Sequence, residues 1–212
     1  KRDARKAAPG PRKRYGHTVP RLFTPPAVTG KPGPCGCGCA LTPATSLGFD
    51  AVEFAEETLL ITLNPWQRWL LIHALELNPD GTLRFRRIIV LVARQNGKST
   101  LSQVLALYAM CVRGARLVLG TAQDLDTAEE VWQGAVDLAE ELDDETDEPL
   151  RPDLFDMVDH VVQKNGAKAL VLTTGERWKV KAANRRAGRG LTGDLVMLDE
   201  LREHQTWNAW AA

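Results

Sequence analysis

The sequence predicts an α/β fold in which helices flank a mainly parallel sheet on both faces. Three apolar runs, at residues 88–92, 116–121 and 194–198, are rich in Val, Ile and Leu, as strands buried on both faces are. Apolar residues at helical spacing follow the first run at 101–111 and the second at 126–142. Strands that alternate with helices in this way are typical of a parallel sheet.

The other elements are predicted from local patterns. Residues 49–60 have apolar side chains at helical spacing, and Asn64-Pro65 is a typical helix start, with Asn64 as the N-cap. Turn signals separate three shorter strand-like runs, at 158–163, 169–173 and 177–182.

Composition sets broad limits on function. The 212 residues suffice for one sizeable domain, and 44% hydrophobic and 25% charged residues are ordinary for a globular protein. The formal net charge is zero, so bulk charge indicates neither a nucleic-acid nor a membrane partner. No apolar run approaches the ~20 residues of a membrane helix, and we expect no membrane partner.

Residues 1–45 are rich in Pro, Gly and basic residues, which favours a flexible arm outside the domain at 46–212. The arm either contacts DNA or a partner subunit or is simply solvated, and its removal should barely change the melting temperature. It contains Cys35, Cys37 and Cys39, whose Cys-x-Cys spacing does not match the usual zinc pattern. We therefore expect reduced, flexible cysteines rather than a metal site.

A short polar turn after the run at 88–92 leads into a helix and contains Gly97-Lys98-Ser99. Strand, turn, Gly-Lys-Ser and helix form the arrangement of a phosphate-binding loop, or Walker A motif. Backbone N–H groups and the helix dipole would attract a phosphate there. Lys98 would reach the β- and γ-phosphates, and Ser99 would offer its hydroxyl to Mg²⁺. The first glycine of the usual pattern is replaced by Val92.

A second predicted strand, Asp194–Leu198, ends in two acids, Asp199 and Glu200, which is the form of a Walker B strand. Asp199 would hold the water shell of Mg²⁺, and Glu200 would polarise the attacking water. Two acids at a strand end are also common where a strand simply enters solvent. Their combination with a Gly-Lys-Ser loop about a hundred residues earlier favours the nucleotide site.

These motifs resemble those of tailed-bacteriophage terminase large subunits, over roughly Ser46 to Trp210. Ala93–Ser99 is similar to that family's deviant Walker A loop, which often lacks the first glycine and carries an arginine before Gly-Lys. Asn64–Gln67 resembles its adenine-side motif, and Asn184–Gly190 resembles the Arg/Gly-rich run before Walker B. The implied fold is a P-loop NTPase of the additional-strand ASCE type.

The resemblance implies a set of site residues. ATP would be bound by the loop, which consists of Arg94, Gln95, Asn96, Gly97, Lys98, Ser99 and Thr100. Gln67 would read the adenine edge, or would instead complete a capping box with Asn64, and the sequence leaves both roles open. An arginine finger would come from Arg189, with Arg185 and Arg186 as alternatives, or this basic loop would bind DNA phosphates.

The implied function is that of an ATPase that uses Mg²⁺ and ATP to drive double-stranded DNA into a procapsid. Expected partners are further copies in a ring, a portal protein and a small terminase subunit, in the cytoplasm of an infected bacterial host. The chain would be the ATPase domain of a longer protein, truncated after Walker B and without the nuclease domain. Two other functions fit the same residues: another P-loop DNA translocase or helicase, and a non-hydrolysing ring-assembly module. Glu200 argues against the second.

Overall fold

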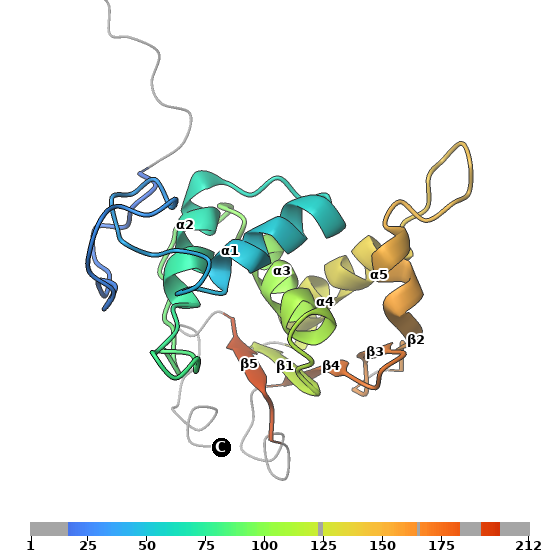
Figure 1. Cartoon of the computed structure of the whole chain (residues 1–212). Helices are drawn as coiled ribbons and strands as arrows, with labels where there is room; N and C mark the ends of the chain where they lie inside the picture. The colour runs from blue at the N-terminus through green and yellow to red at the C-terminus, as the bar shows by residue number, and fades with distance from the viewer. Residues whose placement is uncertain (1–16, 123–124, 165, 183–191, 200–212) are drawn as a thin grey trace, which may run out of the picture.

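The computed structural model describes residues 17–122, 125–164, 166–182 and 192–199. Within these ranges, five strands form one sheet in the order β2-β3-β4-β1-β5 (Figure 1). Their bounds are Leu117–Ala122 (β1), Val158–Val162 (β2), Ala169–Leu172 (β3), Arg177–Ala182 (β4) and Leu195–Leu198 (β5).

The sheet is mixed rather than mainly parallel, which corrects the prediction. β1 runs parallel to β4 and to β5, but β3 is antiparallel to both β2 and β4. The reason is local, because tight connections join β2 to β3 and β3 to β4, and a tight turn can only join antiparallel strands. Gly175, at φ +98°, lies in the second of these turns. The parallel part is therefore β4-β1-β5.

The helices cover one side of the sheet in the view of Figure 1, whereas we expected helices on both faces. They are α1 (Gly48–Glu53), the π-helix η1 (Phe54–Thr58), α2 (Pro65–Ala74), α3 (Lys98–Cys111), α4 (Leu125–Glu140) and α5 (Pro152–Met157). The core lies between α3, α4 and the sheet, where Trp132 and Trp178 are fully buried. None of the helices in the described part of the chain has the length and hydrophobicity needed to cross a bilayer.

The predicted buried strand at 88–92 is wrong for this structure. No strand is assigned there, and Ile89 and Leu91 are 67% and 94% exposed. A strand forms only where a neighbour accepts and donates its backbone hydrogen bonds, and no strand in the described ranges pairs with this run. The Walker B run does form a strand, β5, but at the edge of the sheet, and Val196 is 51% exposed.

Residues 17–45 are irregular but not loosely draped. Leu41 is fully buried, and the buried carboxylate of Glu76 accepts hydrogen bonds from the N–H groups of Ala27 and Val28, at 2.7 and 3.3 Å. Arg84 pairs with the same carboxylate at 2.6 Å. The expectation that this stretch adds nothing to the core is therefore wrong for its described part.

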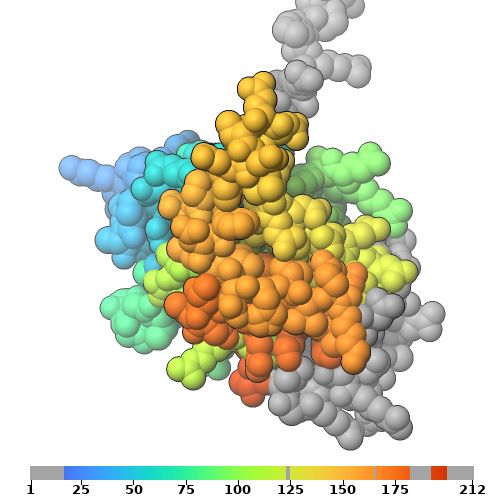
Figure 2. Space-filling model, turned by 90° about the vertical axis from the view of Figure 1, so that its right-hand side faces the viewer, coloured from blue at the N-terminus to red at the C-terminus, as the bar shows by residue number. Residues whose placement is uncertain are grey.

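An acidic loop, residues 141–150, projects from the body of the molecule in both Figure 1 and Figure 2. It follows α4 and is closed by a bridge between Leu142 and Pro149. The Asp143 carboxylate accepts bonds from the N–H groups of Glu145 and Thr146, which lower the pKa of Asp143. The negative charge of this loop repels polyanions.

Candidate functional site

The predicted phosphate loop has a tightly turned backbone. Gln95 and Gly97 have left-handed conformations, with φ of +58° and +81°. The Asn96 side chain donates to the carbonyls of Ala93 and Arg94, at 3.2 and 3.0 Å, and so closes the turn on itself. α3 begins directly afterwards at Lys98, three residues before the predicted start at 101, so the unpaired N–H groups of its first turn follow the loop. This combination of turn and helix N-terminus favours an anion.

Gln67 connects this loop to the start of α2. Its side chain is 2% exposed, its Oε1 accepts from the N–H of Asn64 at 2.7 Å, and its Nε2 donates to the Gly97 carbonyl at 2.8 Å. The first bond is the capping interaction that the sequence left open. Each end of the amide therefore makes one bond within the chain, which leaves one N–H and one oxygen lone pair for any further partner.

Gly97 is suited to its position for two reasons. Its positive φ disfavours any side chain, and a Cβ placed there would lie 2.8 Å from Nε2 of Gln67. The close approach of Gln67 thus depends on glycine, which ties the helix start at Asn64 to the geometry of the loop.

Topology brings the loop and Asp199 to the same edge of the sheet. α3 packs against β1 and β5, and residues 112–116 connect its end to the start of β1. With so short a connection, α3 runs antiparallel to β1, so its N-terminus lies near the carboxyl ends of β1 and β5. Asp199 follows β5 there and its N–H bonds to the Thr121 carbonyl at 2.9 Å. In α/β folds, ligands bind at this edge.

The other predicted residues are placed as follows. The side chains of Arg94, Gln95, Asn96 and Ser99 are exposed, and those of Lys98 and Thr100 are half-buried. The hydroxyl of Ser99 and the carboxylate of Asp199 are oxygen donors of the kind that Mg²⁺ prefers. This donor set fits the expected ion, and exposure of the loop leaves it open to a nucleotide. Glu200, Arg185, Arg186 and Arg189 lie outside the described residues.

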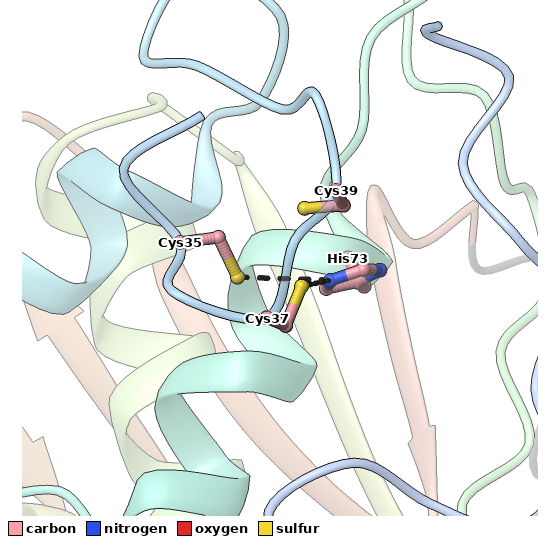
Figure 3. A group of neighbouring side chains, drawn as sticks. All are labelled: Cys35, Cys37, Cys39 and His73. Atoms are coloured by element: carbon pink, nitrogen blue, oxygen red, sulfur yellow. Dashed lines mark hydrogen bonds between the residues drawn. The ribbon is translucent and has the colours of Figure 1, made fainter. Parts of the chain in front are cut away.

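A second group of reactive side chains was not predicted. Cys35, Cys37 and Cys39 lie close to His73 of α2 (Figure 3). Burial lowers the pKa of His73 by more than the negative charge of Glu76 raises it, so the imidazole is neutral at neutral pH. The only signal in the sequence was the dense cysteine motif, because nothing in the spacing relates it to a histidine 34 residues further on.

Comparisons with family models, with curated proteins and with solved structures found no match to this chain. The two sites are therefore the features of this chain that bear on its function. The loop at the start of α3 is the one that bears on nucleotide chemistry. The cysteine cluster is built from softer ligands.

Proposed function

We propose that this chain is an ATPase of the terminase type, which uses Mg²⁺ and ATP to drive double-stranded DNA into a viral procapsid. The observation that carries the proposal is the loop before α3. It combines the predicted Gly-Lys-Ser motif with left-handed residues at Gln95 and Gly97, directly before a 14-residue helix. Asp199 lies at the carboxyl end of β5, next to β1, which supports a nucleotide site at this edge.

Each residue has a defined part in this proposal. Loop N–H groups would bind phosphate oxygens, and Lys98 would neutralise charge on the β- and γ-phosphates. Ser99 and Asp199 would hold Mg²⁺, which shields the negative charge of the phosphates when it is bound. Glu200 would orient the attacking water, and Arg189 of a neighbouring copy would stabilise charge in the transition state.

The proposal that DNA is the partner has its own support on β4. Arg177, Lys179 and Lys181 alternate with Trp178 and Val180, which are buried against the core. The three cations therefore point to the face of the sheet opposite α4. Burial, together with the charges of Arg177 and Lys181, lowers the pKa of Lys179, as expected for clustered cations. Such a cluster could bind DNA phosphates without sequence preference.

The same resemblance suggests the setting. Further copies of the chain in a ring, a portal protein and a small terminase subunit would be its partners, in the cytoplasm of an infected bacterium. The acidic loop at 141–150 would face away from DNA in such an assembly, because like charges repel.

Calorimetry with ATP and Mg²⁺ tests the nucleotide site. Lys98→Ala should weaken ATP binding at least roughly tenfold, since a charged hydrogen bond contributes ~1.5–3 kcal/mol. Lys164→Ala removes the same charge from the exposed β2–β3 connection and should bind ATP as the parent does. Equal affinities for the parent and Lys98→Ala, in folded proteins, would contradict the phosphate-loop assignment, as would equal losses in both variants.

A further inference from the structure

The cysteine cluster has the geometry of a closed metal site. Sγ of Cys35, Cys37 and Cys39 and a ring nitrogen of His73 all lie within 4.8 Å of one another. Nε2 of His73 is 3.4 Å from Sγ of Cys37 and 3.7 Å from Sγ of Cys35. Figure 3 shows the sulfurs of these two cysteines turned toward the imidazole.

The local sequence explains how one short loop brings three sulfurs together. Cysteine alternates with Gly36 and Gly38, which have left-handed φ values of +78° and +89°. A Cβ at either glycine would meet no atom within 4 Å, so the backbone conformation, not lack of space, requires glycine there. The N–H of Gly33 donates to the Cys39 carbonyl at 2.7 Å and closes the loop.

The histidine is held in place for this contact. His73 is 6% exposed, and its ring stacks on Trp69 with centroids 4.0 Å apart and planes 18° from parallel. Phe23, from the segment before the loop, packs edge-on against the Trp69 ring at 5.1 Å. A ring clamped in this way can present Nε2 to the sulfurs without losing further conformational entropy. All four cysteines of the chain are free thiols, so no disulfide explains the cluster.

We propose that Cys35, Cys37, Cys39 and His73 bind one Zn²⁺ ion in a closed, tetrahedral structural site. With Zn–S bonds of ~2.3 Å and Zn–N bonds of ~2.0–2.1 Å, tetrahedral ligand atoms lie roughly 3.5–3.8 Å apart. The contacts at 3.4 and 3.7 Å already match this spacing, and the remaining ones need to shorten by about 1 Å at most. Three thiolates and an imidazole are a typical structural zinc set. Mg²⁺ and Ca²⁺, which require oxygen ligands, do not suit it.

The zinc site would attach residues 17–45 to α2. This segment has no helix or strand of its own, and its other described anchors include the Glu76 bonds, the Arg84 bond to the Pro25 carbonyl, the Leu77 N–H bond to the Thr45 carbonyl, the Phe23 contacts and buried Leu41. Metal binding contributes directly to folding free energy where the ligands come together only in the folded state. Three of the ligands lie in the segment and one in the helix, so removing zinc should release the segment while leaving the sheet intact.

Metal analysis of the purified full chain is the first test. After dialysis against a weak chelator, mass spectrometry should find close to one zinc per chain. Cys37→Ser and His73→Phe should lose it, and His73→Phe keeps an aromatic ring to stack on Trp69. Cys111→Ser is the matched control, because Cys111 lies on α3 outside the cluster and should leave the zinc content unchanged. Parent protein without zinc, or zinc retained equally by all variants, would overturn the proposal.

Three further experiments guard against variants that fail to fold. His73→Cys supplies a fourth thiolate and should still bind one zinc, unlike His73→Phe. In the parent chain, replacing zinc with Co²⁺ should give the visible bands of a tetrahedral cobalt thiolate, and a strong chelator should speed hydrogen exchange in peptides covering residues 22–45. Octahedral cobalt bands, unchanged exchange after chelation, or a Cys35–Cys37 disulfide in the freshly isolated protein would each contradict the site.

Discussion

Gln67 offers the sharpest test of how the predicted phosphate loop is held. Gln67→Leu keeps similar bulk but removes the acceptor for the Asn64 N–H and the donor to the Gly97 carbonyl. The loss of these two hydrogen bonds also leaves the part-buried N–H of Asn64 without its acceptor, and together this corresponds to ~2–4 kcal/mol of unfolding free energy. For a chain of this size that is a melting temperature lower by roughly 4–16 °C. Gln103→Leu, which loses one bond to the Val131 carbonyl, is the control and should cost ~0.5–1.5 kcal/mol.

Gln67→Glu separates the two bonds. A carboxylate still accepts from Asn64 but cannot donate to Gly97, and its charge lies against the carbonyl there. The helix cap should therefore survive, and only the loop should loosen. Because an unpaired charge is then buried beside a carbonyl oxygen, we expect a loss of stability at least as large as in Gln67→Leu and a comparable loss of ATP affinity.

Nucleotide selectivity decides between the two roles of Gln67. If it holds the loop, both variants should weaken ATP and GTP binding by the same factor, since the loop contacts only phosphates. Calorimetry with both nucleotides measures this ratio. A variant that loses its preference for ATP over GTP while its melting temperature stays within a degree of the parent would refute the loop-holding role and assign Gln67 to adenine.

Three other variants test the remaining assignments. Glu200→Gln should keep ATP binding and lose turnover, because charge is removed while shape is kept; joint loss in a folded protein would indicate a structural or metal role. Arg189→Ala should bind ATP normally and hydrolyse it roughly 10³–10⁵-fold more slowly. In mixed assemblies, Glu200→Gln subunits retain Arg189 and should partly restore phosphate release by the Arg189→Ala subunits. Absence of this rescue would mean that the arginine does not act between subunits. Deleting residues 1–40 should reduce the free energy of unfolding in urea by about 3 kcal/mol or more, because the buried carboxylate of Glu76 loses two N–H donors. An unchanged urea midpoint would show that the segment adds nothing to stability.

Helices and strands with strong local patterns were predicted close to their observed bounds. The start of α2 at Asn64-Pro65, the helix after Gly97, and strands β1 to β4 are confirmed. These elements depend on capping residues, apolar spacing and turn glycines, all of which act within a few residues. The antiparallel arrangement of β2, β3 and β4 could also have been predicted from the short connections between them.

Predictions that depended on distant partners were less successful. The run at 88–92 has the composition of a buried strand, yet Ile88, Ile89, Val90 and Leu91 are exposed. The pattern could not reveal this, because it does not show whether a partner strand is present. The low apolar content of residues 17–45 suggested a loose arm, yet single contacts at Glu76, Trp69 and Leu41 hold it. Composition reflects only the average hydrophobicity of a segment, so it cannot identify such individual contacts.

The sequence by itself determined the Gly-Lys-Ser motif, the acids after β5 and the helices and strands with strong local patterns, because each is a property of neighbouring residues. Only the tertiary structure decided that the amide of Gln67 is used by Asn64 and Gly97, which lie on separate elements. It also brought His73 to three cysteines more than 30 residues away in the chain. Spacing along the chain could not reveal that site, since its ligands converge only when the segment before α1 folds back over α2, placing the sulfurs around one imidazole.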